Sequence, residues 1–161
     1  MSLSLTLTPE ILDRLDISPA IALLAPLLEQ GHLLESEPNL SFRIEYPQEP
    51  GDPRELSEIP EIRLWFVRLD AYYPWLPLIL DWKGGELARY TAMLVPHQFH
   101  PTEGIQFNPE GLEIFVMHKT FVLLEWLQSQ GITGKSRIQD MAQMLGYELV
   151  DEFFALVQEC G

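Results

Sequence analysis

Residues 55–98 contain the densest group of large rings in the chain and read ELSEIPEIRLWFVRLDAYYPWLPLILDWKGGELARYTAMLVPHQ. Three of the four tryptophans, Trp65, Trp75 and Trp82, lie in this segment. The segment is too apolar for a surface loop, yet charged side chains interrupt it, and an apolar core disfavours charges unless they are paired. We therefore interpret it as the centre of a folded domain.

The pattern inside this segment predicts three strands. Residues 62–73 are apolar on both faces of a strand, which predicts a central strand covered on two sides, or with one side left for a partner. Residues 76–82 and 86–95 flank the KGG sequence of residues 83–85, which is typical of a hairpin turn. The last arm also has helical spacing, and we favour a strand. We expect the three segments to form adjacent antiparallel strands.

The preceding part of the chain mixes strands and helices. Residues 2–7 and 41–46 alternate between apolar and polar side chains, which predicts two strands. A capping residue followed by proline predicts helices over 9–16 and 19–30. Residues 47–61 are rich in proline and acidic side chains, which indicates an irregular, exposed connection.

The C-terminal part has a helical pattern. Asn108 caps and Pro109 begins a helix that runs to about residue 130. Because this helix is apolar nearly all round its middle, we expect it to be the central buried helix. Two shorter helices are predicted over residues 136–146 and 149–159.

Length and composition indicate one folded domain. The 161 residues are 47% hydrophobic and 21% charged, which is typical of soluble globular proteins. No internal repeat or low-complexity tract is visible. The sequence therefore predicts a single α+β domain over residues 1–161, with an antiparallel sheet and helices packed on it.

The net charge of −14 is concentrated near the N-terminus, where residues 1–62 carry twelve acidic and three basic side chains. Such a surface repels nucleic acid, because phosphate binding needs several Lys or Arg to release counterions. It also disfavours anionic membranes and favours a basic protein partner. The most apolar run, residues 112–127, is broken by charges, so we expect no membrane insertion and no nucleic-acid partner.

Cys160 is the single cysteine of the chain. One thiol forms no internal disulfide and cannot complete a zinc or iron–sulfur ligand set, so we expect a reducing compartment. The N-terminus lacks the basic character of an export or organelle signal. From these two features we expect a cytoplasmic protein.

Histidines near residue 100 are the candidate metal ligands, together with one carboxylate: His97, His100, His118 and Glu103. A loop that contains Pro101 does not hold two imidazoles on one face as a helical HxxxH motif does. We expect no metal and no other cofactor. We interpret His97 as a hydrogen-bonded residue at the end of a strand.

Asp81 and Glu86 could form a carboxylate pair for acid–base chemistry across the expected hairpin. No nucleophile motif and no glycine-rich phosphate loop accompany them, so we expect no enzyme. The alternative is a small enzyme or metal-binding protein that uses His97, His100, Asp81 and Glu86.

Charged and aromatic side chains share the central segment. Arg68 and Asp70 are expected on one strand face, in a partly buried ion-pair network with Arg63 or Arg89. The aromatic residues are either core or an exposed docking patch, because Trp and Tyr are common in both places. The aromatic residues concerned are Trp65, Tyr72, Tyr73, Trp75, Trp82 and Tyr90.

Three stretches of the chain resemble the chlororespiratory reduction six family. They are residues 52–98, residues 15–22 (LDISPAIA) and residues 107–121 (FNPEGLEIFVMHKTF). The resemblance implies a soluble assembly factor, or chaperone, of the photosynthetic NAD(P)H dehydrogenase-like complex of cyanobacteria and chloroplasts. It implies no catalytic residues, and it implies the iron–sulfur subunit of the peripheral arm as the partner. The absence of a transit peptide is expected of a cyanobacterial member.

The partner surface is expected over the central segment, with aromatic anchors beside charged residues that fix the register. The acidic run 49–61 would add salt-sensitive attraction to a basic target. The residues expected to bind the partner are Arg63, Trp65, Arg68, Asp70, Trp75, Asp81, Trp82, Arg89, Tyr90 and His97.

Overall fold

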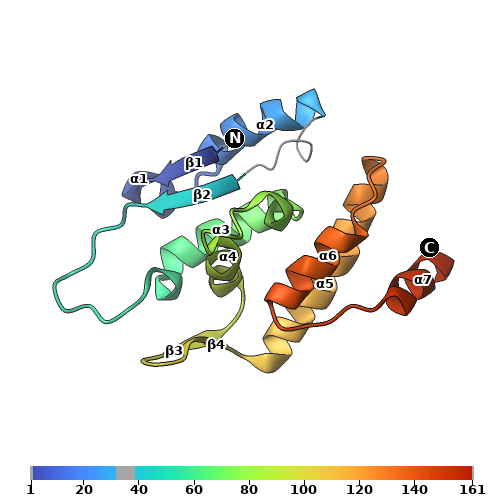
Figure 1. The fold of residues 1–161 in the computed structure, drawn as a ribbon. Coiled ribbons are helices and arrows are strands. Elements are labelled where there is room, and N and C mark those ends of the chain that lie inside the picture. The colour runs from blue at the N-terminus through green and yellow to red at the C-terminus, as the bar shows by residue number, and fades with distance from the viewer. Residues whose placement is uncertain (1, 32–38, 161) are drawn as a thin grey trace.

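The computed structural model describes residues 2–31 and 39–160 (Figure 1). The class is α+β, as the sequence predicts, although helices dominate it. Two single 3-10 turns are labelled η. The elements in chain order are β1 (Ser2–Leu7), α1 (Pro9–Asp13), α2 (Ser18–Gln30), β2 (Asn39–Ile44), η1 (Leu56–Glu58), α3 (Pro60–Tyr72), η2 (Leu76–Ile79), α4 (Glu86–Leu94), β3 (His97–His100), β4 (Gly104–Phe107), α5 (Pro109–Ser129), α6 (Lys135–Met144) and α7 (Asp151–Cys160).

The predicted sheet over residues 62–95 is wrong, because its first and last arms are the helices α3 and α4. Pro60 occupies the first position of α3, where its missing N–H costs nothing. Ile62, Trp65 and Leu69 then fall on one buried face at helical spacing. The sequence pattern of an apolar run that is buried on most sides fits a strand and a helix equally well. In this protein the run forms a helix.

The expected middle strand and hairpin are also absent from this stretch. Residues 76–79 form η2, and the only strand-like pairing is a parallel bridge between Leu80 and Leu40. Gly85 has φ of +83°, in the left-handed region that glycine adopts at little cost. It stands immediately before α4, so the KGG turn leads into a helix and not into a second strand.

The described strands form two separate pairs. β1 and β2 are parallel, with Ser2 opposite Asn39, and α1 and α2 lie between them in the chain. β3 and β4 form an antiparallel hairpin, with His97 opposite Phe107. The strand at residues 2–7 is therefore confirmed, and the strand expected at 41–46 begins two residues earlier.

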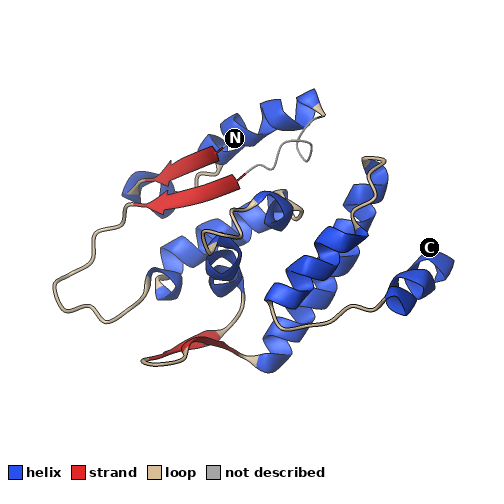
Figure 2. Ribbon diagram, in the orientation of Figure 1, coloured by secondary structure: helices blue, strands red, loops and turns tan. Residues whose placement is uncertain are grey.

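α3 and α4 lie between the two strand pairs (Figure 2). Phe42 of β2 makes edge-to-face contacts with Trp65 and Phe66 of α3, at centroid distances of 6.2 and 5.0 Å. Phe66 in turn contacts Tyr90 of α4 at 5.8 Å. A continuous aromatic core therefore joins β2, α3 and α4.

α5 begins where the sequence predicts, since the Asn108 side chain accepts a hydrogen bond from the Gly111 amide at 2.8 Å. The expectation of a central buried helix is wrong. One face, including Val116, packs against α6 and the core, whereas Ile114 and Phe121 on the outer face are 70% and 48% exposed. Apolar side chains all round a helix do not require burial all round, because much of any folded surface is apolar.

The remaining helices agree closely with the sequence. α1, α2, α6 and α7 lie within about two or three residues of the predicted bounds. The connection at residues 47–61 is irregular only as far as residue 55, where η1 and then α3 begin. None of the helices in the described ranges combines the length and apolar character needed to cross a bilayer.

Candidate functional site

The outward face of α3 carries a stripe of exposed apolar side chains, which we call the α3 outer face: Leu64, Val67, Ala71 and Tyr72. Leu64, Val67 and Tyr72 are 52%, 48% and 56% exposed. Residues three, four and seven apart share one side of a helix, so these four side chains lie together over two turns, with the exposed Arg68 between Leu64 and Tyr72. The sequence held this signal, but only a helical interpretation of residues 62–73 would have revealed it.

Two residues of α3 are fixed to the segment that follows α1. The indole N–H of Trp65 donates to the Asp16 carbonyl at 2.8 Å, and the Arg68 guanidinium donates to the Leu15 carbonyl at 2.7 Å. Leu15 has φ of +52°, an uncommon conformation for a residue other than glycine. Trp65 is buried and Arg68 is exposed, so these two predicted binding residues orient the outer face and only Arg68 can touch a partner.

Asp70 lies in a buried polar network that joins α3, α4 and α5. Its carboxylate forms an ion pair with Lys119 and accepts a hydrogen bond from the Tyr90 hydroxyl at 3.0 Å. Lys119 also donates to the Pro74 carbonyl at 3.0 Å. The predicted pairing of Asp70 with an arginine of the segment is therefore wrong, because a lysine 49 residues away takes that place.

Burial dominates the electrostatics of this network. It lowers the pKa of Lys119, and the Asp70 carboxylate opposes that shift. It raises the pKa of Tyr90 well above its ordinary value, and Asp70 adds to the increase. An ion pair removed from water in this way specifies how the helices meet.

The two arginines that were expected to pair with Asp70 have other partners. Arg63 donates to the Met93 carbonyl at 3.4 Å, and Arg89 pairs with Glu86 at 2.8 Å. Burial raises the pKa of Glu86, although Arg89 opposes the shift. The Asp81 carboxylate accepts a hydrogen bond from the Gly84 amide at 2.9 Å and so stabilises the turn before α4. Asp81 and Glu86 therefore each have a structural partner.

His97 joins β3 to η1, as expected of a hydrogen-bonded residue at a strand end. Its Nδ1 lies 2.9 Å from the Val95 carbonyl, which can only accept, so Nδ1 carries the proton. Nε2 then accepts from the Ser57 hydroxyl at 3.0 Å. A Ser–His pair is the first part of a nucleophilic triad, but here a neutral carbonyl replaces the carboxylate that stabilises an imidazolium. We assign the pair a structural role.

The four residues of the alternative enzyme or metal site do not converge. His97 and His100 are three positions apart on one strand and so point to opposite faces of β3. The pocket beside His97 is lined by neither Asp81 nor Glu86. Within residues 2–31 and 39–160, no three potential metal ligands are grouped.

Most of the aromatic residues in the segment are core. Trp65, Tyr73, Trp75 and Tyr90 are buried, so for these four the core is the correct one of the two alternatives that the sequence left open. Trp75 stacks on Trp126 of α5 at 4.9 Å. Burying one such ring stabilises the fold by about 1.5–3 kcal/mol. Tyr72 is exposed and Trp82 is half-buried, and these two remain available to a ligand or partner.

The family model described as chlororespiratory reduction 6 matches residues 7–156, which is nearly the whole chain. No solved structure matches the fold.

Proposed function

We propose a function from one premise: the chain belongs to the chlororespiratory reduction 6 family. The proposed function is that of a non-enzymatic assembly factor of the photosynthetic NAD(P)H dehydrogenase-like complex. Its client would be the iron–sulfur subunit of the peripheral arm, bound before that arm is complete. The proposed location is the place where the client is made, the cytoplasm of a cyanobacterial cell.

The α3 outer face is the observation that carries this proposal. Leu64, Val67 and Tyr72 are each about half exposed on two turns of one helix, and neighbouring exposed apolar side chains of this kind often mark protein-interaction sites. Apolar anchors of this kind supply most of the binding energy of protein interfaces. The buried network and the contacts with α1 hold the helix rigidly, so little conformational entropy would be lost on docking.

The negative charge of the segment before α3 supports a client with a basic surface. Residues 45–61, which lead into α3, carry six acidic side chains and one arginine. Arg54 is already paired with Asp52 at 2.9 Å, and the net charge of this segment is strongly negative. Such a surface accelerates association with a positively charged partner and does so less at high salt. The protein would thus shield a surface of the client that is apolar in its centre and basic at its edge.

The chain contains a single cysteine, which cannot hold a cluster by itself. The proposed role is therefore to protect or present the client polypeptide, and the cluster would be supplied by other proteins. The exposed members of the predicted site, such as Arg68, would help to set the register within the α3 outer face.

A complementation experiment in a cyanobacterium tests the proposal. In cells that lack the protein, we expect the wild-type chain to restore the assembled peripheral arm, measured on native gels. A Leu64→Ser/Tyr72→Ser variant should fail, because it removes two anchors without disturbing the core. The matched control is Ile114→Ser/Phe121→Ser, which removes exposed apolar side chains from α5 instead. The proposed function is wrong if the arm assembles normally without the protein, and only the assigned face is wrong if the control alone fails.

A further inference from the structure

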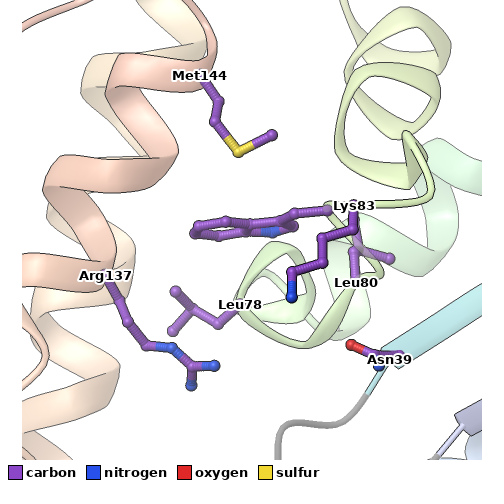
Figure 3. A pocket seen from close by; sticks show the side chains of 7 residues that line it. Asn39, Leu78, Leu80, Lys83, Arg137 and Met144 are labelled. Atoms are coloured by element: carbon purple, nitrogen blue, oxygen red, sulfur yellow. The ribbon is translucent and has the colours of Figure 1, made fainter.

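A pocket of about 310 Å³ opens beside Trp82, between α6 and the segment that precedes α4 (Figure 3). It is formed by three parts of the chain that are distant in sequence: the start of β2, the segment around η2, and α6. Its lining residues are Asn39, Leu78, Leu80, Trp82, Lys83, Arg137 and Met144.

The apolar part of the pocket is held in place by backbone contacts. The Asp81 amide donates to the Leu40 carbonyl at 3.0 Å, next to the bridge between Leu40 and Leu80. The indole N–H of Trp82 donates a hydrogen bond to the Pro77 carbonyl at 2.8 Å. The N–H of Trp82 is therefore already satisfied, and its apolar ring lines the pocket together with Met144.

Two positive charges flank this apolar surface. Seven of the ten basic residues of the chain make an ion pair or hydrogen bond with the described residues: Arg43, Arg54, Arg63, Arg68, Arg89, Lys119 and Lys135. Lys83 and Arg137 make no such contact with the part of the chain that the structure describes, and both line this pocket. The Asp81 carboxylate next to Lys83 is engaged by the Gly84 amide.

Two such cations at one apolar pocket are unexpected in a chain with a net charge of −14. A bound anion would be attracted to both of these cations. Arg137 can bind a carboxylate through two parallel N–H donors, and Lys83 adds a mobile point charge. The pocket volume lies at the lower end of the range of about 300–1,000 Å³ that small-molecule sites occupy.

We propose that this pocket binds a carboxylate that is attached to a small apolar group. The apolar group lies on Trp82, Leu78 and Leu80, and the carboxylate lies between Lys83 and Arg137. Two sources have this chemistry: a free aromatic or branched aliphatic acid, and the C-terminal residue of a peptide. The site is separate from the α3 outer face and does not depend on the proposed function.

Titration followed by NMR tests the proposal, with the Trp82 indole and the Met144 methyl signals as reporters. One arm uses 3-phenylpropionate against its neutral amide, and the other uses an acetylated tetrapeptide ending in leucine, with a free or an amidated C-terminus. We expect at least one free acid to shift both signals, and its amide to bind about tenfold more weakly, because a charge-assisted contact is lost. The arm that responds identifies the source.

A pair of charge variants completes the test. Lys83→Ala/Arg137→Ala should weaken binding of the responding acid about tenfold, whereas Arg14→Ala/Arg43→Ala removes the same charge elsewhere and should leave it unchanged. The proposal is overturned if neither acid moves the Trp82 and Met144 signals at millimolar concentration. It is equally overturned if the amides bind as well as the acids, or if both double variants weaken binding alike.

Discussion

The side chain of Lys119 on α5 is 1% exposed, and its ammonium group is paired with the carboxylate of Asp70 on α3. The same carboxylate accepts a hydrogen bond from the hydroxyl of Tyr90 on α4. One acidic group therefore links α3, α4 and α5. This relationship fixes the orientation of α3 and therefore of the apolar stripe on its outer face. The structure of the proposed docking surface depends on a charge that the solvent scarcely reaches.

Loss of the Asp70 charge should destabilise the fold. In Asp70→Asn the buried Lys119 ammonium loses its counter-charge, and we expect the free energy of unfolding to fall by about 3 kcal/mol, measured by urea denaturation. The triple variant Asp70→Leu/Tyr90→Phe/Lys119→Met removes both charges and the hydroxyl that donates to Asp70, and it should recover much of that loss. An Asp70→Asn value within about 0.5 kcal/mol of wild type, the range of ordinary surface substitutions, would contradict the account.

Tyr90 should make stability fall at alkaline pH. Because burial raises the pKa of Tyr90 above its ordinary value of 10.0, the folded chain keeps a proton that the unfolded chain releases. Stability is therefore lost as the pH rises above about 10, by up to about 1.4 kcal/mol per pH unit. Tyr90→Phe has no phenol and does not lose stability in this way. The difference in unfolding free energy between wild type and Tyr90→Phe should therefore shrink above pH 10.

Urea denaturation of the two proteins between about pH 8 and pH 11 measures this difference. Lys119 titrates in both proteins, so the comparison isolates the phenol. If the difference in unfolding free energy between wild type and Tyr90→Phe stays constant over this pH range, Tyr90 ionises in the folded protein as it does in the unfolded chain.

The Ser57–His97 hydrogen bond should hold the β3–β4 hairpin against η1. Ser57→Ala removes the donor to Nε2, and we expect a loss of about 1 kcal/mol in unfolding free energy. Amide hydrogen exchange should accelerate most in β3, since that strand loses its side-chain link to η1. The substitution Ser41→Ala, on the β1–β2 pair, is the matched control. Unchanged exchange at Phe99 would mean that the bond adds nothing to the hairpin.

Local signals in the sequence predicted much of the helical framework. The Asn108–Pro109 start of α5 was correct because a cap and a proline act within one turn and need no distant partner. The fold class and the strand at residues 2–7 were also correct. The burial of α5 was not, because which sides of an apolar helix are covered depends on how many neighbours pack on it.

α3 shows where sequence reasoning failed. Its residues are apolar on both faces of a strand, and the same residues place Ile62, Trp65 and Leu69 on one face of a helix. The choice between the two was made by tertiary packing against β2 and α4, which the pattern alone does not contain. The partner of Asp70 was missed for the same reason, since no local rule links it to Lys119.

The affinity of the purified protein for the purified iron–sulfur subunit tests the central claim most directly. Isothermal titration calorimetry should show binding by the wild type, and Val67→Asp on the α3 outer face should weaken it by about 2 kcal/mol or more. Ile114→Asp places the same charge on α5 and should bind as the wild type does. Wild-type affinity in Val67→Asp, or no binding by the wild-type protein, would contradict the account.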